Sequence, residues 1–329
     1  MVVNLSRPLR GGVVGAAIAF LAVGCGANGE HRVISRYYSA TDSMGAAPTH
    51  LSIVRRDTPT DLVENSAAAM SMTQPGIFFT INDSGNEPLL FALDTANTDR
   101  GVWRVTNATN SDWEAASVGL CSQGAAAWCV YIGDTGDNEA THRSRKIYRT
   151  AEPQAMASGG LDSVHAEKLT YEYPNGPQDV EAMYVSRNAD VFLIAKRPRL
   201  DPSGRHPLPA LVYRLPASAW VNKGHVVAEL VDSLPIAPGS APFRLITDAS
   251  LSPDAKHLAV RTYMQLYVFD TDSVTGRVNH SVPPAVCNLL TVDEVQGEGV
   301  TWIDNRGRFL FTTEGRRAPI ALADCPLPP

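Results

Sequence analysis

The sequence predicts an all-β protein, a single β-propeller of five blades closed by an N-terminal strand. Three observations predict this fold. Strand-like runs recur along the whole chain after residue 50, and almost nothing there shows the apolar spacing of a helix. The second strand of each repeated unit ends at a charged residue, five times over. Radial repetition of short sheets leaves few exposed sheet edges, so a repeat of this kind is typical of propellers.

The second strands are the clearest elements of the repeat. They read GIFFTIND, WCVYIGD, DVFLIAK, KHLAVR and RFLFTTE, and they end at Asp83, Asp134, Lys196, Arg261 and Glu314. A short strand that opens with an acidic residue precedes each of them. These openings are Glu64, Glu114, Glu181, Asp248 and Glu298. Third strands follow as PLLFALD, RKIYRTAEP, ALVYRLP, QLYVFD and APIALADC, and outer strands such as GVWRVTNAT and EKLTYEY complete several units.

The last unit has no fourth strand of its own, because the chain ends at ADCPLPP. We expect THLSIVRR, from Thr49 to Arg56, to supply that strand and close the ring. A count of six blades would need one further unit, either between Arg149 and Asp179 or between Arg197 and Leu211.

The N-terminus has the pattern of an export signal. Arg7 and Arg10 precede an apolar run of 14 residues, GGVVGAAIAFLAVG, which is too short to span a bilayer. The run ends at LAVGC, which resembles a bacterial lipobox with Leu21 one place earlier than usual. We therefore expect a signal peptide over residues 1–25, lipidation of Cys25, a flexible tether over 26–48 and the propeller domain over 49–329. A plain secretory signal is the alternative.

An exported protein is expected to form disulfides between its cysteines, because oxidising compartments favour these bonds. The cysteines outside the signal are even in number and allow three pairings; they are Cys121, Cys129, Cys287 and Cys325. The first two flank a short segment between two strands, a spacing suited to a bridge across a hairpin. We expect Cys121 to pair with Cys129 and Cys287 with Cys325.

The charge of the chain limits its partners. The formal net charge is -6, and no run of basic residues is longer than two, so a nucleic-acid binder is excluded. Cations, sugars and other small molecules are the expected ligands, with a protein ligand as a further class. The only membrane contact expected is the lipid anchor.

The geometry of a propeller predicts where the acidic residues meet. The first strand of each blade lines the central channel and the second runs antiparallel to it, so the start of one and the end of the other share a face. Burying a charged carboxylate costs free energy unless hydrogen bonds or an opposite charge stabilise it. Hydrogen bonds from a neighbouring blade's backbone, a hard cation such as calcium, and a substrate site are the three alternatives.

The cation and the substrate site each have candidate residues. The metal ligands expected are Glu64, Glu114, Asp134, Glu181, Asp248 and Glu298. The ligand-binding residues expected are Lys196, Arg261 and Asp83. If a pair of carboxylates acts as acid and base, the candidates are Glu114, Asp134, Glu181, Glu298 and Glu314.

Several of these segments together resemble a family of exported bacterial propeller proteins, and they are distantly similar to phytase-like propellers. The segments include ENSAAAMSMTQPGIFFTINDSGN, YIGDTGDN, LSPDAKHLAVRTY and QGEGVTW, and the similarity covers roughly residues 60–325. The phytase likeness implies acids with Lys or Arg around the channel that bind calcium and phosphate. The acids, Lys196 and Arg261 are compatible with that, but the full complement of basic residues is absent from the motifs.

Two classes of function follow. The first is an exported, lipid-anchored propeller of the bacterial cell envelope whose acidic mouth binds a cation and recognises a ligand or partner. The second is a hydrolase that uses the same mouth, either a calcium-dependent phosphoesterase or a carboxylate-pair glycoside hydrolase. The mixed set of residues singles out neither a nucleophile nor a base, so the first class is favoured.

Overall fold

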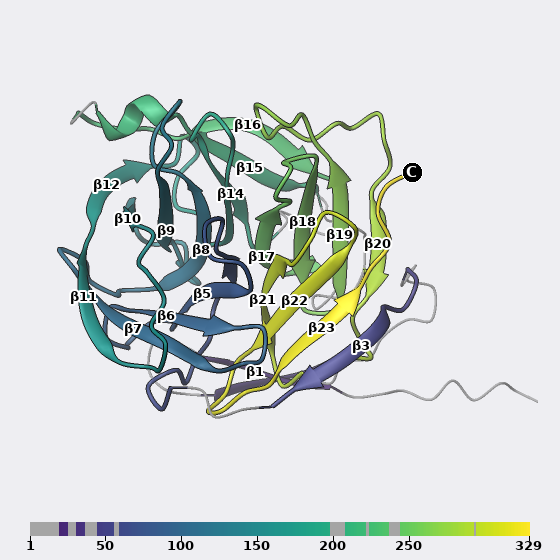
Figure 1. The fold of residues 1–329 in the computed structure, drawn as a ribbon. Coiled ribbons are helices and arrows are strands. Elements are labelled where there is room, and N and C mark those ends of the chain that lie inside the picture. The colour runs from purple at the N-terminus through teal and green to yellow at the C-terminus, as the bar shows by residue number, and fades with distance from the viewer. Residues whose placement is uncertain are drawn as a thin grey trace, which may run out of the picture.

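The computed structural model shows five sheets arranged radially around a central axis (Figure 1). It describes residues 20–25, 31–36, 45–55, 59–197, 208–221, 224–236, 244–292 and 294–329. The predicted five-bladed propeller is confirmed. Within the described ranges, the two segments considered for a sixth blade contribute only strands of the five sheets.

Each blade is a sheet whose first three strands follow one another in the chain. Blade 1 has the strands β4 (Ala69–Met70), β5 (Ile77–Ile81), β6 (Leu89–Asp94) and β7 (Asp99–Thr106), with β11 (Leu161–His165) added in parallel to β7. Blade 2 has β8 (Trp113–Leu120), β9 (Trp128–Asp134), β10 (Ser144–Ala151) and β12 (Glu167–Glu172). Blade 3 has β13 (Val180–Val185), β14 (Val191–Ala195), β15 (Ala210–Leu215) and β16 (Glu229–Leu234), with the 3-10 helix Ala217–Trp220 between the last two.

The remaining blades complete the ring. Blade 4 has β17 (Ile246–Leu251), β18 (His257–Thr262), β19 (Gln265–Asp270) and β20 (Ala285–Asn288). Blade 5 has β21 (Gly297–Trp302), β22 (Arg308–Thr313), β23 (Ile320–Asp324) and β3 (Thr49–Val54). A separate pair is formed by β1 (Phe20–Cys25) and β2 (His31–Arg36).

The N-terminal strand closes the ring as the sequence predicts. Strand β3 pairs antiparallel with β23, with Ile53 opposite Ala321. The two strands are more than 260 residues apart in the chain, from Thr49–Val54 to Ile320–Asp324. Pairing the start of the propeller with its end fixes blade 5 against blade 1.

The core lies between the blades. Apolar residues on facing sheets form clusters that each join neighbouring blades, as Ala116 and Phe79 do for blades 1 and 2. The indole rings of Trp113 and Trp302 are fully buried there, and each N–H donates to a backbone carbonyl, of Thr109 and Ser250 respectively. Inner strands such as β13 and β14 are buried on both faces in this way, which explains why they read as nearly continuous apolar runs.

Both predicted disulfides are confirmed. Cys121–Cys129 closes the β8–β9 hairpin with a Cα–Cα distance of 5.0 Å, and Cys287–Cys325 joins blade 4 to the segment after β23 at 5.6 Å. Disulfides of this kind indicate an oxidising, extracytoplasmic location.

The predicted export signal and the predicted tether fall largely outside the described residues. Cys25 is the last residue of β1, and its lipidation stays a prediction. The chain reaches the propeller at Ala46, whose carbonyl accepts a hydrogen bond from the N–H of Asn288 at 2.7 Å. Among the described residues, no helix has the length and apolar character needed to cross a membrane.

Candidate functional site: an acidic channel mouth

A β-bulge near the start of the first strand sets the geometry of the channel mouth. In blade 2, Trp113 pairs with Asp134 and Ala115 with Gly133, so Glu114 is an extra residue on its strand. A bulge breaks the regular alternation of side chains and re-aims the extra one. Glu114 is therefore turned out of the ladder between two residues that pack in the core.

The bulge recurs in every blade. The pairings isolate one extra residue in the same position of blades 3 and 4, and in blade 5 they set Glu298 and Gly299 against Thr312 alone. In blade 1, the strand likewise has one residue more than its partner between the Asn65–Asn82 and Ala69–Phe79 pairs. We call the five equivalent residues the bulge ring: Ser66, Glu114, Glu181, Thr247 and Glu298. All five are buried.

A second set of equivalent residues follows the last paired residue of each second strand. We call these the strand-end ring: Asp83, Thr135, Lys196, Tyr263 and Glu314. A third set, the lead-in residues, lies two places before the bulge ring: Glu64, Asp112, Asp179, Leu245 and Gln296.

A repeated backbone hydrogen bond confirms that these sets are equivalent. In four blades the N–H of the strand-end residue donates to the carbonyl of the lead-in residue: Asp83 to Glu64 at 2.9 Å, Thr135 to Asp112 at 3.1 Å, Lys196 to Asp179 at 2.9 Å and Glu314 to Gln296 at 3.0 Å. The three sets together define the mouth of the channel.

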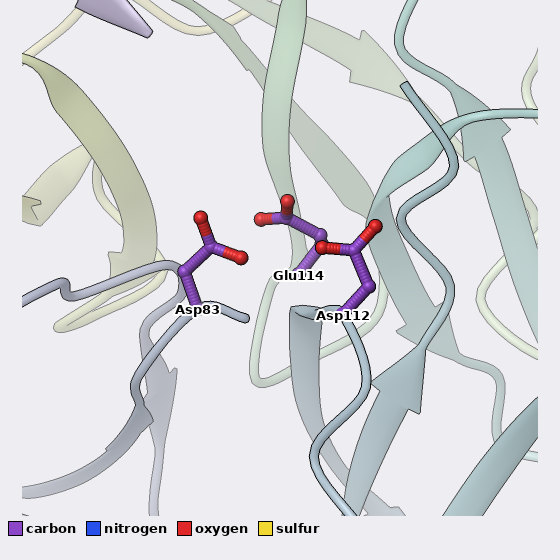
Figure 2. Close-up of side chains that lie close together, drawn as sticks. All are labelled: Asp83, Asp112 and Glu114. Atoms are coloured by element: carbon purple, nitrogen blue, oxygen red, sulfur yellow. The ribbon is translucent and has the colours of Figure 1, made fainter. Parts of the chain in front are cut away.

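Three carboxylates of the mouth form a group that could hold a metal ion. They come from all three sets: Asp83, Asp112 and Glu114. One oxygen from each lies within 4.8 Å of the others, and among the described residues this is the one such group of His, Cys, Asp or Glu side chains. Figure 2 shows the carboxylates of Asp112 and Glu114 beside each other, with Asp83 approaching from a separate loop.

The pKa values of this cluster are shifted upward because the charges are buried together. Burial and then the negative charge of Asp83 raise the pKa of Asp112 to about 7. The same two causes raise the pKa of Glu114 well above its usual range, and burial raises that of Asp83. The hydroxyl of Ser66 donates to Glu114 at 3.0 Å. A divalent cation would relieve the repulsion that remains.

The loop YIGDTGDN brings its backbone against this cluster. A Cβ at Gly136 would lie 2.6 Å from both Oδ2 of Asp112 and Cγ of Glu114, so only glycine fits there without displacing them. Asp137, by contrast, turns away and accepts hydrogen bonds from the backbone N–H groups of Thr141 and His142. The glycine therefore shapes the mouth, and the acid beside it builds a turn.

The opposite side of the mouth carries a second pair of acids. The side-chain amide of Gln296 donates to Oε1 of Glu298 at 2.6 Å and to Oε1 of Glu314 at 2.7 Å. Burial, with the neighbouring acids, raises the pKa of Glu298 and of Glu314 to about 8. Tyr263 lies within electrostatic reach of both, and burial first and then Glu298 raise the pKa of its phenol.

Lys196 is the only cation among the bulge and strand-end rings, and Glu181 is its partner. Its ammonium donates to Oε1 of Glu181 in a buried ion pair. Burial alone would lower the pKa of Lys196, but Glu181 and the other acids hold it well above its usual range. Electrostatic effects link Glu181 with Glu114 on one side and with Glu298 on the other. Glu181 thus lies between the two acidic halves of the mouth.

The structure places Asp134, Asp248 and Arg261 elsewhere than the sequence pattern predicts. Asp134 is the last paired residue of its strand, one place before the strand-end ring, and it accepts the N–H of Asp112 at 2.8 Å. It also lies 3.4 Å from the ammonium of Lys146. Its carboxylate therefore positions the loop that carries Asp112.

Asp248 and Arg261 are buried away from the mouth. Asp248, one place after the bulge, accepts backbone N–H groups of Ala249 and, from blades 1 and 5, of Ala68 and Val300. The bond from another blade's backbone is the first of the three compensations that the sequence suggested.

Arg261 is fully buried and lies two places before the strand-end ring. Its guanidinium donates to the carbonyl of Gly299 at 2.7 Å and pairs with Glu294. This side chain is committed to interior contacts, so it does not offer an anion-binding group to the mouth.

Glu64 keeps a place at the mouth, as a lead-in residue, and its carboxylate accepts the amide of Asn86 at 2.7 Å. The residues that sequence reasoning missed are mainly the other lead-in residues and Tyr263. A signal for them exists in the chain. This signal is a three-residue pattern, an acid followed by any residue and then Glu, which occurs as DWE and as DVE. In blade 5 it occurs as QGE, where an amide replaces the first acid.

Comparisons with known proteins leave the family open. No family model matches the chain, and no curated protein matches it. The expected membership of an exported propeller family and the phytase likeness therefore stay predictions.

Solved structures similar to the chain include a PQQ-bound aldose sugar dehydrogenase from Streptomyces coelicolor, at 10% identity and a TM-score of 0.44, covering 85% of this chain and 99% of that one. A second is the Cps50 (Swd1) β-propeller domain of Myceliophteria thermophila, at 11% identity and a TM-score of 0.39, covering 85% and 99%. A carbohydrate-active enzyme of family AA12 from Trichoderma reesei is also similar, at 10% identity and a TM-score of 0.39, covering 88% and 99%. Likeness at this level does not bear on the chemistry of the mouth.

Proposed function

We propose that this chain is an exported propeller that binds calcium at Asp83, Asp112 and Glu114 and recognises a ligand at the mouth of its channel. The observation that carries the proposal is the close approach of the three carboxylates, whose oxygens lie within 4.8 Å of one another. Calcium takes six to eight oxygen ligands at about 2.3 to 2.6 Å. Three carboxylates supply part of that number, and a ligand or solvent completes it.

The charge balance of the mouth supports a cation. The bulge ring and the strand-end ring contain five acids and one lysine, and that lysine is paired with Glu181. Burial and repulsion raise the pKa of Asp112 to about 7 and that of Glu114 well above its usual range, and this favours the protonated forms. A divalent ion would displace those protons and be held by the resulting negative charge.

A chelator-stripped sample titrated with calcium tests the proposal. Binding to the native state raises stability by RT ln(1 + [L]/Kd), which is about 2.7 kcal/mol at a hundredfold excess over Kd. We expect a saturable rise in Tm for the wild type and little or none for Asp112→Asn or Glu114→Gln.

The matched control is Asp190→Asn, which removes a mostly buried acid paired with Arg214 at 3.1 Å, at the opposite end of β14. It should lower Tm but keep the calcium response. A wild-type Tm that calcium leaves unchanged would contradict the proposal.

A second candidate function is glycoside hydrolysis by a pair of carboxylates. The observation that favours it is the pair Glu298 and Glu314, whose pKa values of about 8 keep a proton available at neutral pH. Release of sugar from a panel of nitrophenyl glycosides, lost in Glu314→Gln, would support it. The committed contacts of Lys196 and Arg261 do not favour a phosphoesterase.

The export proposal extends to a lipid anchor on Cys25, by which the propeller would be held at the bacterial envelope. The disulfides support an oxidising compartment. In the native host, we expect the mature protein to remain with the membrane fraction, and Cys25→Ser to release it. A wild-type protein found in the soluble fraction would indicate a plain secretory signal.

A further inference from the structure

We infer that the ligand of the mouth is a neutral polyhydroxylated molecule, a sugar or glycan end, held between the calcium ion and the side chains around Glu181. This inference rests on the proposed calcium site and adds the class of ligand. It follows from which polar atoms around the mouth lack partners, and from the mixture of donors and acceptors beside them.

Blades 2 and 3 contain buried polar atoms of the mouth that have no hydrogen-bond partner among the described residues. Oε2 of Glu181 and Oδ2 of Asp179 are buried, and neither takes part in a hydrogen bond with any residue that the structure describes. Oδ2 of Asp179 has an ion-pair contact, at 3.7 Å from the guanidinium of Arg197, so Glu181 offers the stronger unpaired acceptor. The buried hydroxyl of Thr135 likewise has no hydrogen-bond partner among the described residues. Glu181 and Thr135 are at most 2% exposed. An unpaired buried oxygen is costly, and a ligand that donates O–H or N–H groups would remove that cost.

Glu181 lies within electrostatic reach of both acidic halves of the mouth. It belongs to the bulge ring, and its charge interacts with Glu114 beside the calcium site and with Glu298 across the mouth. Its Oε1 is used by Lys196, so Oε2 is the atom left for a ligand. A molecule bound there would lie next to the cation.

The bulge ring and the strand-end ring hold five acids and one lysine, and this balance disfavours an anionic ligand. A purely cationic ligand needs acceptors alone. The mouth also holds donors: the ammonium of Lys196, which uses one of its three N–H groups on Glu181, and the phenol of Tyr263. Hydroxyl groups both donate and accept, and they are oxygen ligands for calcium. A polyol therefore fits this set better than an amine.

Saturation-transfer NMR on the calcium-loaded protein tests the inference. The probes are mannose, glucose, galactose, fucose and myo-inositol, with spermidine as the cationic probe and inositol hexakisphosphate as the anionic one. We expect at least one neutral probe to bind, and its signal to disappear when calcium is removed with chelator. Spermidine and inositol hexakisphosphate should give no calcium-dependent binding.

Two variants separate this inference from the proposed function. Glu181→Gln should weaken the neutral probe about tenfold, and Glu314→Gln should weaken it as well, while a calcium-dependent rise in Tm persists in both. If Glu181→Gln fails to fold, Thr135→Val removes an unpaired hydroxyl at nearly constant volume and should also weaken the probe.

The outcomes are distinct. If calcium raises Tm but no neutral probe binds, the inference is overturned and the calcium site remains supported. Calcium-dependent binding of spermidine or inositol hexakisphosphate instead of a neutral probe has the same meaning. A wild-type Tm that does not respond to calcium would overturn the proposed function itself.

Discussion

Asp248 lies one residue after the bulge of its strand, and this single step decides what its carboxylate does. Thr247 takes the ring position, and Asp248 accepts three buried backbone N–H groups instead. Acidic residues that look alike in the sequence therefore have different functions: Glu114 faces other acids, whereas Asp248 joins blades. The residue type was predictable, but the facing direction depends on the bulge.

Replacing Asp248 should be among the costly changes in this protein. Asp248→Ala leaves three N–H groups without an acceptor, and each such group costs about 1–3 kcal/mol when buried. We expect the urea midpoint to fall by the equivalent of roughly 3 kcal/mol or more, or folding to fail. Asp248→Asn keeps one carbonyl oxygen as an acceptor, so its urea midpoint should lie between those of the wild type and of Asp248→Ala. An unchanged midpoint for Asp248→Ala would show that the bonds contribute nothing.

Gly136 allows a direct test of the geometry of the cluster. A methyl group there would stand 2.6 Å from Asp112 and from Glu114, so Gly136→Ala should displace one of them and weaken calcium binding about tenfold. The control is Gly224→Ala, where nothing lies within 4 Å of the new Cβ. Calorimetric titration with calcium compares the two, and equal affinities would separate Gly136 from the site.

The secondary-structure elements explain why the sequence predicts the fold fully and the residues of the channel mouth only in part. Second strands such as β14 and β22 are buried on both faces and read as unbroken apolar runs, so their ends were easy to find. A bulge adds one residue to a first strand without breaking its apolar character. It becomes visible only when the strand is paired with its neighbour. This is why Asp112 and Tyr263 were missed, although the strands beside them were found.

The two disulfides should differ in their contribution to stability. In the chain-entropy model, a bond stabilises more when it closes a longer loop. The separations are 8 residues for Cys121–Cys129 and 38 for Cys287–Cys325. Replacing both cysteines of the second pair by serine should cost about 1 kcal/mol more than replacing those of the first. Urea unfolding of the two double variants measures the difference, and a larger loss from Cys121→Ser with Cys129→Ser would reverse the order.

At the scale of the whole molecule, five blades direct acids from distant parts of the sequence into one mouth. Glu64 and Glu314 are 250 positions apart in number, yet both contribute to the field that raises the pKa of the acids there. The ring closure by β3 and the disulfide from blade 4 hold that arrangement together. Stability and cation binding should therefore respond to pH as linked properties of the whole ring.

Without calcium, the protein should become less stable as the pH rises. The pKa values of Glu298 and Glu314 are about 8 and that of Asp112 is about 7 in the folded state, whereas unfolded carboxyl groups titrate near 4. Between these limits the folded state binds more protons than the unfolded state, so the free energy of unfolding falls as pH increases and levels off above the folded pKa values.

Melting curves in chelator between about pH 6 and pH 9 should show a falling Tm. Glu314→Gln should flatten that slope, because it removes one of the acids that bind protons in the folded state. Calcium should have the opposite dependence: protons compete with it for Asp112 and Glu114, so its stabilising effect should grow as pH rises through about 7. A Tm in chelator that rises over this range would mean that the acids of the mouth are ionised and paired in the folded protein.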